Sequence, residues 1–132
     1  MLLGVAMFIS GCGERTRTPT VLQPRPQFFV IDVPVPNRFD LERRRSTHDY
    51  SGGQRSVKHF YTGREDPQAV ANFYRQEMLK YKWELVDQRL QNGVDHLNFN
   101  KGDETCQVRI EKTPGGWFGS KTQVCVAVQA SK

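Results

Sequence analysis

The sequence predicts an α+β fold in which one amphipathic helix packs on a mainly antiparallel sheet of about five to six strands. Three observations support this fold class: an apolar period typical of a helix at 67–82, segments rich in β-branched and aromatic residues on both sides of it, and short turn signals between the later segments. The chain has 132 residues, of which 37% are hydrophobic, enough to build a single core. A second globular unit does not fit.

Two strands are expected before the helix. Residues 28–33 are β-branched and aromatic, and the prolines at 34 and 36 confine such a strand to an edge or to its own end. Residues 37–55 are polar and rich in arginine, with a turn signal at Ser51-Gly52-Gly53, and predict a long loop or an irregular hairpin. Residues 56–63 alternate in polarity until Gly63 and predict the second strand.

The helix is predicted from Pro67 to Lys82. Asp66 is a good N-cap, and Pro67 suits the first helical position because no intrahelical hydrogen bond is lost there. Apolar residues then recur at spacings of three and four and share one face: Val70, Phe73, Tyr74, Met78 and Tyr81.

The C-terminal half predicts a four-stranded meander. Its strands are expected at 83–89, 94–100, 104–112 and 122–129, with short Gly-containing connections between the first three. Short connections make neighbouring strands antiparallel, and the resulting sheet is the large surface on which the helix can bury its apolar face.

The N-terminus carries an export pattern. Residues 2–9 are apolar and uncharged, too few for the roughly 20 that span a bilayer. The motif Ile9-Ser10-Gly11-Cys12 resembles the lipobox of bacterial type II signal peptides. That resemblance implies that residues 1–11 are removed and that Cys12 carries lipid, so that the chain is a lipoprotein of the cell membrane or outer membrane. The alternative is a buried N-terminal element with an ordinary core cysteine.

The expected domain organisation follows from this cleavage. Residues 12–26 contain three prolines and little that can be buried, and predict a flexible tether after the lipidated cysteine. Residues 27–132 then form the single α+β domain, facing the periplasm or the exterior. The formal charge of +5 lies entirely in the first half of the chain, which suits a segment close to anionic lipid.

A second resemblance concerns the helix and the strand after it. Residues 70–78, followed by Trp83-Glu84-Leu85-Val86, resemble a segment of small uncharacterised bacterial envelope proteins, in which a helix with Phe-Tyr and Met leads into a Gly-Trp strand. Lys82 stands where that pattern has Gly. The resemblance implies a fold and no chemistry.

Catalytic and cofactor motifs are weak, so neither a metal nor another cofactor is expected. The candidate catalytic residues are scattered along the chain, and an enzyme would need two or more of them in one cleft. These residues are His48, His59, His96, Asp32 and Asp95. Neighbouring residues such as Ser46, His48 and Asp49 cannot meet as a triad. The glycines at 115 and 119 are too close together for a phosphate-binding loop.

Cys106 and Cys125 remain once Cys12 is lipidated, and an oxidising compartment would favour a disulfide between them. Alternation argues against it. Cys106 shares a face with Val108 and Ile110, whereas Cys125 alternates away from its valine neighbours. The thiols then point to opposite sides of the sheet unless a bulge intervenes, so the disulfide is left open.

Two exposed features are candidate contacts for a partner or a membrane: Trp117-Phe118 in a Gly-rich loop, and the run Arg43-Arg44-Arg45. Export would remove the chain from cytoplasmic nucleic acid, so nucleic-acid binding is not expected. The favoured hypothesis is a non-catalytic, lipid-anchored module that binds or supports an unidentified envelope protein. A small-ligand-binding periplasmic domain and, behind it, an enzyme are the alternatives.

Overall fold

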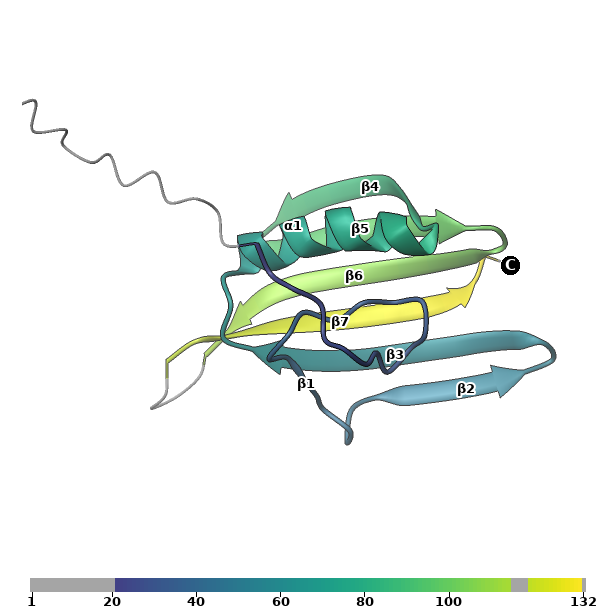
Figure 1. Ribbon diagram of the computed structural model, residues 1–132, viewed down its shortest axis with the longest axis horizontal. Coiled ribbons are helices and arrows are strands. Elements are labelled where there is room, and N and C mark those ends of the chain that lie inside the picture. The colour runs from purple at the N-terminus through teal and green to yellow at the C-terminus, as the bar shows by residue number, and fades with distance from the viewer. Residues whose placement is uncertain (1–20, 115–118, 132) are drawn as a thin grey trace, which may run out of the picture.

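A computed structural model describes residues 21–114 and 119–131 (Figure 1). The elements in chain order are β1 (Asp40–Leu41), β2 (Thr47–Ser51), β3 (Gln54–Gly63), α1 (Pro67–Glu77), the 3₁₀ turn η1 (Met78–Tyr81), β4 (Glu84–Gln91), β5 (Val94–Lys101), β6 (Glu104–Thr113) and β7 (Lys121–Ala130). Within these residues, no helix is long and apolar enough to cross a bilayer.

The strands form one antiparallel sheet, and the α+β class is confirmed. The order is β1-β3-β7-β6-β5-β4, with β2 also pairing with β3. The meander β4-β5-β6-β7 is as predicted, and of the two alternatives for residues 37–55 the structure shows the hairpin, formed by β2 and β3. The sheet has seven strands rather than five to six because the chain beside β3 pairs in two short pieces, β1 and β2, separated by residues 42–46.

The helix begins and faces the sheet as predicted, but its last turn tightens. The Asp66 side chain accepts a hydrogen bond from the Ala69 backbone N–H at 3.4 Å and caps the first turn. The α-helix ends at Glu77, and η1 follows. Lys82 then adopts the left-handed conformation with φ of 69°, and its N–H bonds back to the helix end.

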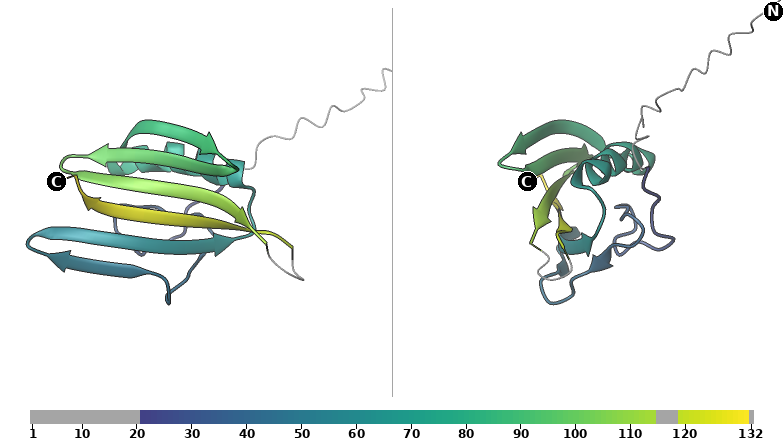
Figure 2. Two further views of the ribbon diagram at one scale, coloured as in Figure 1. Left: turned by 180° about the vertical axis from the view of Figure 1, so that it is seen from behind. Right: turned by 90° about the vertical axis from the view of Figure 1, so that its left-hand side faces the viewer.

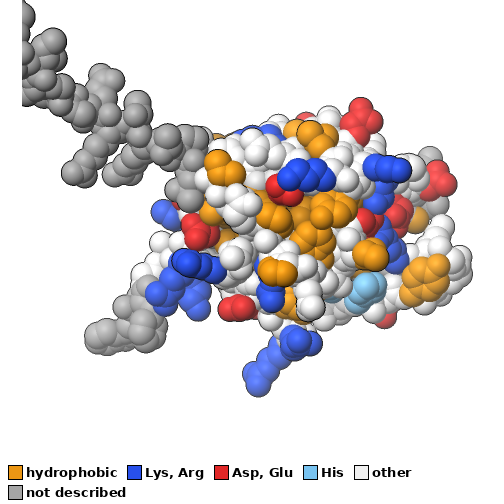
Figure 3. Space-filling model, in the orientation of Figure 1, with side chains coloured by type: hydrophobic (Ala, Val, Ile, Leu, Met, Phe, Trp, Pro, Cys, Tyr) orange, Lys and Arg blue, Asp and Glu red, His pale blue; other side chains and the backbone are white. Residues whose placement is uncertain are grey.

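Two parts of the chain share one face of the sheet (Figures 1 and 2). Helix α1 covers the half nearer β5, and the segment before β1 covers the half nearer β3. That segment contributes four fully or nearly fully buried side chains to the core: Val30, Val33, Val35 and Phe39. Apolar side chains gather where the helix meets this segment, with charged groups around them (Figure 3). No described helix covers the opposite face of the sheet, hereafter the uncovered face (Figure 2).

The strand predicted at 28–33 is wrong. Val30 and Val33 instead close a tight turn through a 3.1 Å backbone hydrogen bond, and Ile31 at its tip is 86% exposed. Prolines at 34 and 36 remove backbone donors on both sides of Val35, so this stretch cannot form a regular ladder. Its apolar side chains are buried by packing over the sheet rather than by joining it.

The predicted tether is too long at its C-terminal end. The Arg25 N–H donates to the Val35 carbonyl at 2.8 Å, and the Asn37 N–H donates to the Gln23 carbonyl at 2.7 Å. Leu22 packs against the core. Backbone hydrogen bonds and a partly buried leucine hold residues 22–26 on the domain, whereas residues 12–20 lie outside the described part.

Candidate functional site

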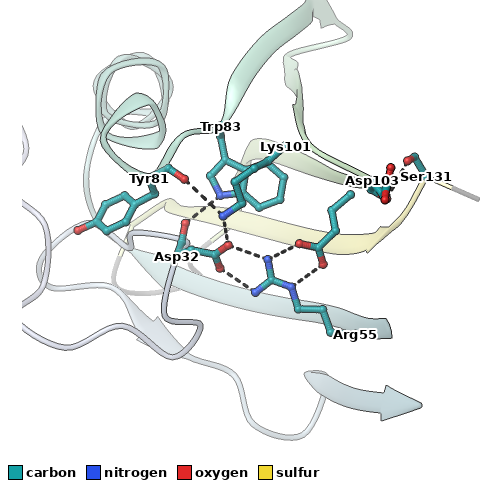
Figure 4. A network of polar contacts seen from close by, with 8 residues as sticks. Asp32, Arg55, Tyr81, Trp83, Lys101, Asp103 and Ser131 are labelled. Atoms are coloured by element: carbon teal, nitrogen blue, oxygen red, sulfur yellow. Dashed lines mark hydrogen bonds and ion pairs between the residues drawn. The ribbon is translucent and has the colours of Figure 1, made fainter. Parts of the chain in front are cut away.

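A cluster of ion pairs fastens the N-terminal segment to one end of the sheet (Figure 4). The Arg55 guanidinium donates to both carboxylate oxygens of Asp32, at 2.8 and 2.7 Å. It also donates to both oxygens of Glu104, at 2.6 and 2.8 Å. The two bidentate pairs make four hydrogen bonds with one guanidinium group, a geometry that fixes its orientation.

Lys101 and Trp83 complete the cluster around Asp32. The Lys101 ammonium bonds to the Asp32 carboxylate and lies 4.5 Å from the centre of the Trp83 ring. The Trp83 indole N–H donates to the Asp32 carbonyl at 2.9 Å. Burial alone would raise the pKa of Asp32, but hydrogen bonds from Arg55 and Lys101 outweigh it and lower that pKa to about 2. Each charge already has its partner, so the cluster is structural.

A second polar group lies on the core face of β3. The His59 imidazole is only 5% exposed, and its Nδ1 lies 2.9 Å from the Tyr61 hydroxyl. The exposed His48 ring on β2 meets it edge to face at 5.7 Å. Burial first, and then the charge of His48, lowers the pKa of His59, which favours the neutral ring.

The five residues considered for an enzyme do not converge in the described structure. His48 and His59 are neighbours, but Asp32 is bound within the ion cluster. His96 lies on the uncovered face of β5, paired with Arg89 and Arg109 in the register, and Asp95 lies on the opposite face. Among the described residues there is no group of three or more metal-ligating side chains.

An open groove of about 470 Å³ separates the first turns of α1 from the β4-β5 hairpin. Its walls come from helix, hairpin and β6: Asp66, Pro67, Gln68, Arg75, Gln88, Leu90, Gly93, Asp95, Ile110 and Lys112. Ile110 is fully buried, whereas Leu90 is 73% exposed. A large apolar side chain left exposed beside a buried one gives the groove an apolar wall that a ligand can cover.

The charged groups of the groove differ in how they are used. The Asp66 carboxylate caps the helix, and the Asp95 carboxylate accepts a hydrogen bond from Gln88 at 3.3 Å. Arg75 donates to the Asn72 side chain, which leaves other guanidinium N–H groups to bond elsewhere. The Lys112 side chain has no polar partner among the described residues. The two cations are therefore the groups best placed to meet an anionic ligand.

The arginine run lies in the break between β1 and β2. Arg43 and Arg44 are exposed. Arg45 is held within the molecule: its guanidinium bonds to Glu42 at 3.1 Å and to Gln123 at 2.8 Å, and it lies 4.0 Å from the centre of the Phe60 ring. Arg45 thus anchors this loop to the uncovered face of the sheet, although its side chain stays 50% exposed beside the exposed Arg43 and Arg44.

The two cysteines are free, and the structure places them on opposite faces of the sheet. Cys106 pairs in register with Val128 and belongs to the core, whereas Cys125 pairs with Arg109 on the uncovered face. No bulge interrupts this ladder, so the alternation persists and a disulfide between them cannot form. Burial raises the pKa of both thiols.

The remaining predicted site residues fall outside the described part of the chain. These are Cys12, for lipidation, and Trp117 and Phe118, for contact with a partner or membrane.

The comparisons with known proteins give one match. A family model described as START domain-like matches residues 44–122, which is more than half of the chain. The chain belongs to the START domain-like family. The matched region runs from the arginine loop to the start of β7 and includes the helix, the groove and Cys106. No curated protein and no solved structure matches the chain.

Sequence reasoning missed the groove and most of the ion cluster. Arg55 and Lys101 fall in predicted connections, and Glu104 begins a predicted strand, so no pattern joined them. Arg75 is not among the residues of the predicted apolar helix face. One signal was available: Leu90 and Ile110 are apolar residues near the ends of predicted strands. Only the pairing of β4, β5 and β6 shows that Leu90 and Ile110 both flank Asp95 in the register.

Proposed function

We propose that the protein is a non-catalytic ligand-binding domain held at the bacterial cell envelope by lipid on Cys12, and that its ligand occupies the groove between α1 and the β4-β5 hairpin. The ligand class is a small amphipathic molecule with an anionic group. The START domain-like match agrees with a ligand-binding role.

The groove is the observation that carries this proposal. An apolar ligand body would cover Leu90, which is 73% exposed, and so remove apolar surface from water. Its anionic end would face Arg75 and Lys112, while both carboxylates of the groove already accept internal hydrogen bonds. Ligand sites generally combine an apolar wall with a few polar groups in this way.

The absence of converging reactive groups in the described residues supports a binding role over catalysis. The cellular address is supported by the lipobox resemblance at Ile9-Ser10-Gly11-Cys12. A lipid anchor would place the domain within reach of membrane-derived amphiphiles, a ligand source that suits the groove's chemistry.

Binding is tested with a dansyl-labelled medium-chain fatty acid as the probe. Lys112→Glu should weaken binding by about fivefold or more, since one ion pair is worth roughly 1 kcal/mol at such an exposed site and the reversal adds repulsion. Lys58→Glu, also an exposed strand lysine but on the uncovered face, is the matched control. Equal affinities for the two variants would contradict the assignment.

The role of the apolar wall is tested with a matched pair of variants. Leu90→Asp should abolish probe binding, whereas Leu79→Asp should leave it unchanged, because Leu79 is 61% exposed on η1 and does not line the groove. Probe binding that survives Leu90→Asp would argue for another site.

The anchor is tested separately in cells fed a radiolabelled fatty acid. Wild type should incorporate label and remain with the membrane fraction, and Cys12→Ser should do neither. Equal labelling of the two proteins would remove the lipoprotein assignment.

A further inference from the structure

Strand β4 forms an open edge of the sheet. It pairs with β5 on one side, and seven of its eight residues are exposed, the exception being Leu85. A long exposed edge offers unpaired backbone N–H and C=O groups to another strand. The opposite edge lacks this continuity because the chain leaves the ladder at 42–46, between β1 and β2.

The side chains of β4 are complementary to those of a second copy of the same strand. Val86 and Leu90 are large apolar residues that are 51% and 73% exposed. Between them, Asp87 and Arg89 form an ion pair at 3.3 Å with side chains that are 49% and 57% exposed. Apolar and charged residues are thus placed symmetrically about Gln88.

We propose that two copies of the chain associate through their β4 edges, as antiparallel strands related by a two-fold axis at Gln88. In this register Asp87 stands opposite Arg89 of the second copy, and Arg89 opposite its Asp87. Val86 stands opposite Leu90 in the same reciprocal way. A self-complementary patch of this kind is what a two-fold interface requires, and both types of cross-strand pair are stabilising.

The geometry of β4 limits the paired region. The register with β5 shifts between Leu85 and Asp87, which is the signature of a bulge at Val86. Pairing therefore extends from Val86 to Leu90, and the bulge marks its N-terminal limit. Because this paired region is short, its backbone hydrogen bonds are few, and the proposed association depends on the side-chain pairs as well.

The association would also adjoin the groove. Leu90 and Gln88 line it, so the second copy's Val86, opposite Leu90, would extend its apolar wall. Two grooves would then flank the two-fold axis. Asp87 and Arg89 do not line the groove, which allows association and ligand binding to be tested independently.

The test uses the full chain in cells, with a cysteine introduced at the proposed axis. Gln88→Cys should form a disulfide-linked dimer on mild oxidation of isolated membranes, because the two residues lie directly opposite one another. Glu84→Cys, exposed on the same strand, is the control and should stay at the background of the unmodified chain. Equal cross-linking at both positions, or none at either, would overturn the proposal.

Reversing the charges of Asp87 and Arg89 tests the proposed register between the two β4 strands. Rescue in a mixed dimer would show that the variants still fold. In the Gln88→Cys background, Asp87→Arg and Arg89→Asp should each lower cross-linking by about tenfold, since like charges then oppose one another twice. Coexpression of the two variants with different tags should restore a mixed dimer, because Arg then faces Asp at both positions. Failure of the mixture to cross-link would refute this pairing.

Discussion

Asp32 holds the N-terminal segment to the sheet, and Asp32→Asn tests that role with little change of shape. The substitution removes the negative charge between Arg55 and Lys101 and keeps one oxygen that accepts hydrogen bonds. The Asp32 side chain is only 16% exposed, so solvent screens the lost charge weakly. Arg55 retains Glu104, and the Trp83 bond to the backbone carbonyl of residue 32 is unaffected.

The expected loss is about 2 kcal/mol of unfolding free energy at neutral pH. The pKa of Asp32 lies at about 2 against an ordinary 3.8, and each pKa unit corresponds to about 1.4 kcal/mol. The folded-state pKa is the lower one, so this contribution is complete above about pH 4 and is lost as the pH falls towards 2. The gap between wild type and variant should shrink to roughly half at pH 3.

Urea unfolding followed by tryptophan fluorescence measures both quantities. A loss of about 2 kcal/mol should move the midpoint down by roughly 1 M at pH 6, given the usual urea dependence for small domains. Asp87→Asn is the control: its side chain is 49% exposed in a single ion pair, so its effect should stay below about 1 kcal/mol. An unchanged midpoint for Asp32→Asn, or a gap independent of pH, would refute the reasoning.

Three further outcomes are expected. Gly63→Ala should destabilise the domain by about 1–3 kcal/mol, because a Cβ there would lie 2.6 Å from the buried Phe39 ring; a neutral result in thermal unfolding would contradict this packing. Lys82→Gly should stabilise it by about 0.5–1 kcal/mol by relieving a left-handed conformation, and a lower melting temperature would argue against that cap. Cys106 and Cys125 should stay unlinked under oxidising conditions and react with iodoacetamide readily only after unfolding, and a linked tryptic pair in mass spectrometry would disprove the face assignment.

Local patterns were enough to predict most of the secondary structure. The alternation at 56–63 and the helical period after Asp66 arise from neighbouring residues. The first lies within β3, which begins two residues earlier at Gln54, and the second gives the observed start of α1. The prediction for residues 28–33 was wrong because β-branched residues suit any buried extended segment, not only one in a ladder. Prolines 34 and 36 were interpreted as marking an edge strand or the end of a strand, whereas the segment folds over the face of the sheet.

The candidate site was harder to predict because its parts are distant in sequence. The groove needs α1, β4, β5 and β6 together, and the helical period that identifies the buried face says nothing about which side chains flank an opening. The same limit applies to Arg75, which lies outside the predicted apolar face of the helix and meets the hairpin only in the folded structure. Arg45 likewise gave no sign of its stacking on Phe60.

By itself the sequence predicted that Cys106 and Cys125 point apart unless a bulge intervenes, and it determined the periodic features: which residues of each strand share a face and where the helix begins. These follow from backbone geometry, which repeats every two residues in a strand and every 3.6 in a helix. Tertiary structure alone decided that β3 pairs with β7, that residues 21–39 complete the core, and that Asp32 meets Arg55 and Lys101. Such contacts join residues distant in sequence and are selected by the free energy of folding of the whole chain. No local sequence pattern reports that free energy.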